Sequence, residues 1–212
     1  MTALRFECLD AESDQYAVGP TVRFKLKVVN RTPDRVHSIA LRIQIRMEPR
    51  RRRYSPEESA KLGDLFGDPS RYAETLNPMQ LAEIGIMVPS FTGEIEVPVD
   101  MPLTYDMEVA STKYFHNLDD GDVPLLMLFS GTIFYSTDAG VQFGQVPWHE
   151  EAEYKLPVAI WKEAMEQHFG GRAWILLRKD KLDALAAYRS ERTIPSWEET
   201  VERLLKEAGV DG

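Results

Sequence analysis

The sequence predicts an α+β fold: an antiparallel β-sandwich, immunoglobulin-like or related, with a short helical insertion and a C-terminal helical subregion. Two observations predict the sheets: residues of alternating polarity recur through the first two-thirds of the chain, and turn residues separate these segments without intervening helices. The last quarter instead carries apolar residues at helical spacing. We therefore expect residues 1–157 to form the sandwich, with an insertion at 55–83. Residues 158–212 should form helices that pack on it and not an independent domain.

The strands are predicted from the period-2 alternation of apolar and polar residues. It is clearest from Val22 to Val28 and from Ile39 to Met47, with a turn at 30–34 between them. We expect these two strands to be neighbours in one antiparallel sheet. Further strands are expected around Cys8 and at 94–99, 105–109, 125–135, 141–145 and 152–156.

The inserted helix is predicted to start at Ser55, Pro56 and Glu58. Serine and glutamate three residues apart form a capping box, and proline is favoured at the first helical position. This helix should end near Gly63 or Gly67. A second short helix should begin around Asn77 or Pro78.

The C-terminal helices are expected at 158–169, at 179–192 and after Ser196, which forms a second capping box with Glu199. The last helix should bury one face, made of Trp197, Val201, Leu204, Leu205 and Ala208. Residues 173–177 fit an additional strand. The four tryptophans, Trp148, Trp161, Trp174 and Trp197, should face inward and hold the helices to the sheets.

The composition argues against several classes of protein. The 212 residues carry a net charge of −9, which argues against broad binding to nucleic acid. The longest apolar run, Val123 to Tyr135, is too short to span a bilayer, and the first residues lack the apolar core of a signal peptide. The single cysteine, Cys8, should be a buried structural thiol, and we expect a cytoplasmic location.

The main candidate site is a run of arginines within LRIQIRMEPRRRRY, residues 41–54. The guanidinium fork binds carboxylates in bidentate fashion, so an acidic protein surface is the expected partner. Two other interpretations stay open: a charged strand end that blocks edge-to-edge aggregation, or pairing with acidic helices of the same chain. The candidate partner-binding residues are Arg46, Arg50, Arg51, Arg52 and Arg53. The candidate internal partners are Glu163, Glu166, Glu198, Glu199 and Glu202.

The residues form no recognisable catalytic, metal or cofactor motif. The four histidines are not at metal-ligand spacing, and the acidic residues around Gly121 lack the closing glutamate of a calcium loop, so they should form a solvated turn. Ser130 lacks the context of a nucleophile elbow. If the protein is instead an enzyme or binds a small ligand, its pocket should lie between the sheet loops and the C-terminal helices. The residues for that alternative are Tyr114, His116, Asp119, Asp122, Trp148 and His149.

Four segments together resemble a family of uncharacterised bacterial proteins, mainly actinobacterial, that are often encoded beside nickel–iron hydrogenase genes. The segments are IQIRMEPRRRRYSPEE, VPSFTGEIEVPV, YDMEVASTKYFHNLDDGDVPLLMLFSGTIF and VPWHEEAEYKLPVAIWKEAM. The resemblance runs from about Leu4 to Leu205. One departure is Leu103, where the family commonly has a cysteine, which puts any shared thiol chemistry there in doubt.

The resemblance implies an accessory or assembly role and supplies no active-site residues. We expect a non-catalytic protein that binds another protein, with a hydrogenase subunit or maturation protein as the implied partner. An enzyme or small-ligand protein is the alternative. A homo-oligomer, formed through a sheet edge or through the tryptophan-bearing helices, also stays open.

Overall fold

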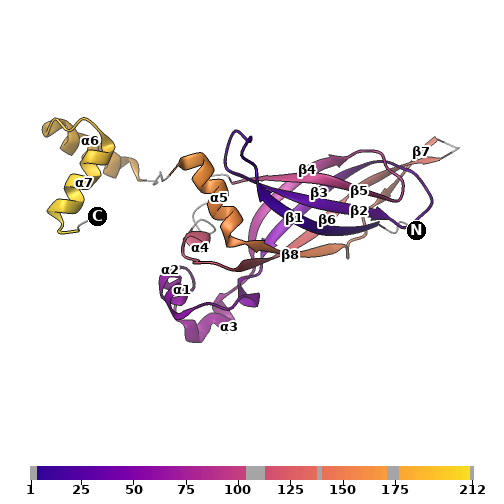
Figure 1. Cartoon of the computed structure of the whole chain (residues 1–212), viewed down its shortest axis with the longest axis horizontal. Helices are drawn as coiled ribbons and strands as arrows, with labels where there is room; N and C mark the ends of the chain where they lie inside the picture. The colour runs from indigo at the N-terminus through magenta and orange to yellow at the C-terminus, as the bar shows by residue number, and fades with distance from the viewer. Residues whose placement is uncertain (1–3, 104–112, 138–139, 171–176, 211–212) are drawn as a thin grey trace. The chain divides into compact units, whose positions relative to one another are not determined.

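The computed structural model describes residues 4–103, 113–137, 140–170 and 177–210. In these ranges the protein has mixed α and β structure, with two antiparallel sheets and several helices (Figure 1). To this extent the predicted fold class is confirmed. The chain divides into two compact units, Met1–Gly171 and Arg172–Gly212, and each is described by itself. None of the helices in the described ranges combines the length and the apolar character needed to cross a bilayer.

The first sheet has three strands in the order β1-β2-β5, formed by β1 (Leu4–Ser13), β2 (Thr21–Asn30) and β5 (Glu94–Pro102). Its inward face is apolar, as the alternation predicted. On its outward face the basic residues of β2 lie between acidic residues of its two neighbours. Arg23 binds Asp14 and Asp100, and Lys27 binds Glu94, so these basic side chains are paired within the face.

The second sheet has five strands. They are β3 (Val36–Met47), β4 (Met79–Val88), β6 (Asp122–Thr137), β7 (Gly140–Gln145) and β8 (Glu151–Pro157). The order is β4-β3-β6, and the other side of β6 pairs with β8 along residues 122–128 and with β7 along residues 132–137. Gly131 lies between these two stretches with φ 148°, and a Cβ there would lie 2.1 Å from the Ala40 carbonyl oxygen. Only glycine fits this close approach of β6 to β3.

The inward faces of the two sheets belong to one hydrophobic core. Phe6 of β1 stacks on Phe129 of β6 with ring centroids 4.3 Å apart, and Phe24 of β2 meets Tyr154 of β8 edge-on. Cys8 is buried in the same core, as predicted. Its burial raises the pKa of the thiol to about 12, so it stays protonated and is a poor nucleophile.

The expectation that β2 and β3 are neighbours is wrong, because they lie in different sheets. The connection between them crosses from one sheet to the other. Asn30 Nδ2 donates to the Asp34 carbonyl oxygen at 2.7 Å, and Val36 N then donates to Phe91 O at 3.0 Å. Alternating polarity fixes which face of a strand is buried, but it does not fix which strand lies beside it.

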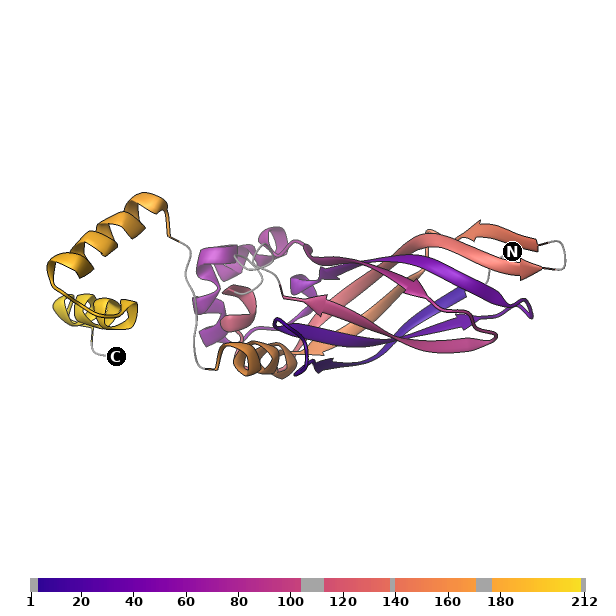
Figure 2. The same ribbon diagram turned by 90° about the horizontal axis from the view of Figure 1, so that it is seen from above.

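The helical segments of the first unit gather at one end of the sheets in both views (Figures 1 and 2). They are η1 (Pro49–Arg51), α1 (Pro56–Lys61), α2 (Gly63–Phe66), η2 (Pro69–Arg71), α3 (Tyr72–Thr75), α4 (Lys113–His116) and α5 (Val158–Phe169). The capping box of α1 is confirmed, with Glu58 N to Ser55 Oγ and Ser55 N to Glu58 Oε2 both at 3.1 Å. The helix expected near Asn77 or Pro78 is wrong, because strand β4 begins at Met79.

Helix α5 has the predicted bounds and ends at Gly170, which takes a left-handed conformation. It packs on β1 and β2, and its Trp161 stacks on Phe115 at 4.1 Å. The inward position predicted for Trp161 is therefore confirmed. For Trp148 it is wrong, because that side chain is 92% exposed in the loop between β7 and β8. The strand expected at 105–109, Trp174 and most of the segment 173–177 lie outside the described residues.

The second unit contains α6 (Lys179–Glu191) and α7 (Trp197–Glu207). Ser196 caps α7, since its Oγ accepts from Glu199 N at 3.1 Å. Tyr188 of α6 donates to the Glu207 carboxylate of α7 at 3.0 Å, and Arg189 lies over the Trp197 ring at 4.2 Å. The prediction that these helices pack on the sheets stays a prediction.

Candidate functional site

The arginine run lies where β3 ends and the helical insertion begins, and we call residues 50–53 the arginine turn. Proline at position 49 starts η1, which carries Arg50 and Arg51, and Ser55 then caps α1. The pairing of β3 with β4 has a register shift between Ile45 and Arg46, two residues before the strand ends at Met47. The four arginines of this short segment differ in their surroundings, because Arg51 and Arg52 have acidic partners in the first unit and Arg50 and Arg53 are exposed.

Arg52 turns into the protein, and its side chain is only 7% exposed. Its Nη2 donates to Glu58 Oε1 and to the Asp120 carbonyl oxygen, both at 2.7 Å, and its Nη1 donates to Asp122 O at 2.9 Å. Gly121 makes room for the guanidinium, because a Cβ there would lie 3.1 Å from Nη1 and its φ is +74°. We call Arg52, Glu58 and the two carbonyl groups the Arg52 clamp.

The Glu58 side chain is 5% exposed and accepts three hydrogen bonds in and around the Arg52 clamp. Its Oε2 closes the capping box of α1, while its Oε1 accepts from Arg52 and also from Asp119 N at 3.0 Å. One carboxylate thus joins the arginine turn, helix α1 and the loop before β6. A buried, hydrogen-bonded ion pair of this kind fixes geometry, and removing either partner leaves a buried charge unpaired.

Arg51 has an internal partner of a different kind. Its Nη1 and Nη2 donate to Glu153 of β8 at 2.8 and 3.1 Å, a bidentate contact between exposed side chains. This bond lowers the pKa of Glu153 and raises that of Arg51. Within the first unit the acidic partners of the turn are thus on α1 and β8, whereas the sequence pointed to Glu163 and Glu166 of α5.

The remaining predicted partner-binding residues are differently placed. Arg50 and Arg53 are exposed, and in the described ranges neither forms an ion pair. Arg46 is half-buried in β3, opposite Gln80 of β4 and Leu126 of β6. Two arginines of the turn are therefore available to a partner, and two are bound internally.

An aromatic cluster lies beneath the arginine turn. Tyr54 donates to Pro49 O and shares a 2.8 Å hydrogen bond with the Tyr114 hydroxyl, and Phe66 packs edge-on against Tyr114. Burial raises the pKa of Tyr54 well above its usual value and that of Tyr114 to about 12. Tyr114, a residue of the alternative ligand pocket, is completely buried here as part of the packing.

The other residues proposed for that pocket fall into two groups. His116, Asp119 and Asp122 are exposed around α4 and the start of β6, where Lys61 binds Asp119 at 2.7 Å and lowers its pKa. Trp148 and His149 precede β8, whose first residue pairs with position 128 of β6 and whose last pairs with position 122. Six residues of strand correspond to about 20 Å, so the two groups are not brought together.

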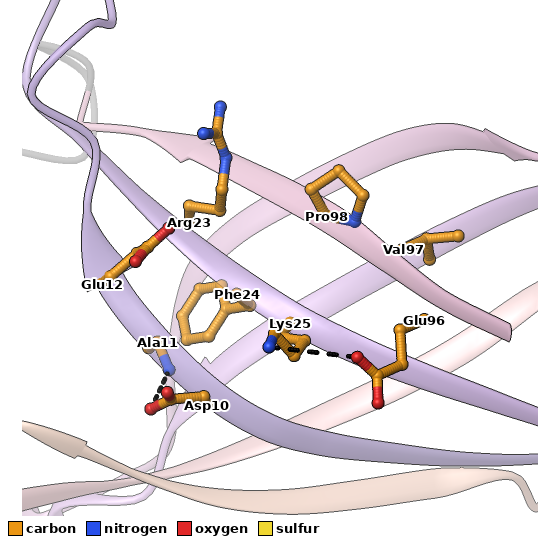
Figure 3. A pocket seen from close by; sticks show the side chains of 9 residues that line it. All are labelled: Asp10, Ala11, Glu12, Arg23, Phe24, Lys25, Glu96, Val97 and Pro98. Carbon is orange, nitrogen blue, oxygen red and sulfur yellow. Dashed lines mark hydrogen bonds and ion pairs between the residues drawn. The ribbon is translucent and has the colours of Figure 1, made fainter.

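A groove of about 330 Å³ is lined by residues of β1, β2 and β5 (Figure 3). Its charged lining residues are largely paired: Arg23 binds Asp14 and Asp100, Lys25 lies 3.9 Å from Glu96, and Asp10 accepts from Ala11 N. The basic residues of the groove are therefore already bound by acidic residues of the same sheet or of its loop. No group of three or more metal-ligating side chains occurs in the part of the chain that the structure describes.

Helix α7 has an apolar face that its own unit covers only in part, by Arg189 of α6 over the Trp197 ring. Trp197, Val201 and Leu205 recur at every fourth residue and are 42%, 43% and 42% exposed, whereas Thr200 is buried. We call these three side chains the α7 face. At 100° per residue, Glu198 and Glu202 lie along one border of this face. The sequence identified this apolar stripe and predicted that it is buried, and its packing on the sheets stays a prediction.

These features define an α and β protein with two antiparallel sheets, an internally bonded arginine turn and an amphipathic helical hairpin. The chain belongs to a family of unknown function, DUF6084, whose pattern matches residues 1–212. The comparison with curated proteins finds no match.

Solved structures with some similarity include a putative late embryogenesis abundant protein, at 13% identity and a TM-score of 0.31, covering 73% of this chain and 72% of that one. A β-glucosidase from Kluyveromyces marxianus matches at 10% identity with a TM-score of 0.28. β-Glucosidase 3B from Thermotoga neapolitana matches at 12% identity with a TM-score of 0.27. Each covers 73% of this chain, which spans only 15% and 17% of the two enzymes. These scores are too low to indicate a shared fold.

Proposed function

We propose that this protein is a non-catalytic interaction or assembly factor that docks on another protein through the α7 face. The observation that carries the proposal is the exposure of Trp197, Val201 and Leu205 on one side of a short helix. Three large apolar side chains at this spacing are the usual anchors of a helix that binds in a groove. Exposed apolar patches of this kind are associated with binding sites.

The charges around the α7 face specify the partner. Glu198 and Glu202 border it on one side, and α6 contacts α7 on the other, where Arg189 lies over the Trp197 ring. An apolar groove with lysine or arginine on its rim is therefore the complementary surface. Antiparallel pairing of two α7 helices is disfavoured, because the same acidic border would face itself. Arg50 and Arg53 offer a second contact, to an acidic part of the same partner, as the sequence predicted.

The proposed class of partner follows from the family resemblance, and the proposed cytoplasmic location follows from Cys8. Subunits and maturation proteins of nickel–iron hydrogenases are the first partners to test. A reducing cytoplasm suits a chain whose single cysteine is a buried free thiol. We also propose that the two sheets form an immunoglobulin-like sandwich, which the shared core and the Phe6–Phe129 stack support.

The test uses the full chain with a photo-crosslinking amino acid in place of Val201, and in a control at exposed Glu191 on α6. The cross-linked partner is identified by mass spectrometry, purified and titrated with the wild-type chain. We expect cross-linking at position 201 but not at 191, into a peptide with apolar and basic residues. Val201→Asp and Glu202→Lys should each weaken binding about tenfold or more.

Two results would count against the proposal. In the first, position 201 captures nothing more than position 191 does. In the second, Val201→Asp keeps both its circular dichroism spectrum and its full affinity for the purified partner. Unchanged affinity in an Arg50→Glu, Arg53→Glu double variant would remove only the second contact.

A further inference from the structure

The edges of the two sheets are not equally covered. β4 lies beside β5, and β1 lies beside β8, so these four strands shield one another across the two sheets. Among the strands of the described ranges, β7 pairs with β6 alone, on one side. The β6–β7 hairpin extends past the ends of the neighbouring strands in both views (Figures 1 and 2). The outer side of β7 is therefore an open sheet edge.

The register shows which backbone groups of β7 point outward. Val146 N, just beyond the strand, donates to Gly131 O of β6 at 3.0 Å. Because the direction of backbone groups alternates along an antiparallel strand, residues 142 and 144 also point to β6, whereas 141, 143 and 145 point away. The outward N–H and C=O groups of Phe143 and Gln145 have no bonding partner in the part of the chain that the structure describes.

Strand β7 lacks the features that usually protect an open edge. Its sequence, GVQFGQ, has no charged residue and no proline, whereas β1, β5 and β8 all carry charges on their outward faces. Phe143 is 80% exposed and lies opposite half-buried Phe134 of β6. A neutral strand with an exposed aromatic residue at its centre is suited to pairing with a further strand.

We infer that β7 is the pairing edge of a homodimer, in which β7 of a second copy adds antiparallel to it and joins the two sheets into one. A twofold axis at Phe143 pairs position 143 with itself and 141 with 145, so all three outward-directed residues find partners. The register brings Phe134 and Phe143 of both copies into one row across the joined sheet. Pairing about a twofold axis sets the strand against itself, so the absence of charge favours a second copy over a charged peptide.

The test measures the mass of the full-length protein by sedimentation velocity over a range of concentrations. Because the edge is short, we expect a reversible dimer and not an obligate one. Phe143→Lys places two like charges opposite each other and should raise the dissociation constant about tenfold or more. Phe143 is exposed, so the variant should fold normally. Trp148→Lys, which replaces an exposed aromatic residue outside the strand, is the matched control and should leave the dimer unchanged.

Disulfide trapping checks the register. Phe143→Cys should form a cross-linked dimer on mild oxidation, because paired Cα atoms lie about 5.5 Å apart. Gln145→Cys should not, since the two 145 positions would be about 14 Å apart along the strands. A protein that stays monomeric up to about 1 mM overturns the inference, because so weak a dimer has no role. The inference is also overturned if Phe143→Lys leaves the dissociation constant of the dimer unchanged. The same holds if Gln145→Cys forms the cross-linked dimer as readily as Phe143→Cys, or if Phe143→Cys forms its disulfide with a different protein.

Discussion

Removing Arg52 should destabilise the first unit far more than removing its neighbour Arg51. Both arginines form an ion pair with a glutamate in the structure, but only the Arg52 pair is buried, with side chains 7% and 5% exposed. Arg52→Ala leaves Glu58 as a buried charge and removes the donors to Asp120 O and Asp122 O. Breaking one side of a buried pair typically costs about 3–5 kcal/mol.

For a unit of this size, that loss corresponds to a fall in Tm of about 6–20 °C. The assay is urea unfolding followed by circular dichroism, with the midpoint and slope compared between variants. Arg51→Ala is the matched control. This substitution removes a bidentate contact between exposed residues, so the urea midpoint of the variant should stay close to that of the wild type.

The double variant Arg52→Leu, Glu58→Gln separates the unpaired charge from the lost hydrogen bonds. With no charge left in the site, it should recover part of the stability lost in Arg52→Ala, although the glutamine keeps fewer of the three bonds that Glu58 accepts. The reasoning is refuted if Arg52→Ala and Arg51→Ala shift the midpoint equally. It is also refuted if the urea midpoint of Arg52→Ala is higher than that of the double variant.

Three further predictions concern other parts of the fold. Because the folded-state pKa of Cys8, about 12, lies above the usual value of 9.0, the unfolded state loses the proton first, so unfolding free energy should fall as pH rises from 9 toward 12. Cys8→Ala should reduce this slope in urea titrations at several pH values. Gly131→Ala should cost about 3 kcal/mol or more, whereas Gly85→Ala, with open space around it, should cost less than about 1 kcal/mol in the same assay. Ser196→Ala removes the cap of α7 and should cost that helix about 1 kcal/mol, seen as faster amide exchange in its first turn.

Local chemistry made some elements of this fold predictable from the sequence. The capping box at Ser55 and Glu58 and the glycine that ends α5 at Gly170 depend on residues within one turn of each other. Strand β4 also carried a signal, since Ile84, Ile86 and Val88 alternate with more exposed residues. A turn-like Asn-Pro before it led to the wrong expectation of a helix.

The candidate site was harder to predict because its partners are distant in sequence. Arg52 binds groups at positions 58, 120 and 122, and nothing local distinguishes it from the arginines beside it. One signal was present: a capping glutamate needs only one of its two oxygens for the cap, so Glu58 had an oxygen to spare. The pairing of β2 and β3 failed for the same reason, since neighbours in a sheet are set by the path of the whole chain.

The distribution of charge changes where a partner should be sought. The sequence draws attention to its arginines, but two of the four in the arginine turn are bound internally, and the basic residues of β2 are neutralised by their neighbours. Burying apolar surface drives association more strongly than exposed ion pairs do. The exposed apolar surface of α7 and β7 should therefore provide better anchors than the remaining arginines. If so, Val201→Asp should weaken partner binding more than the Arg50→Glu, Arg53→Glu double variant does. The opposite order would show that the arginine turn is the main binding surface.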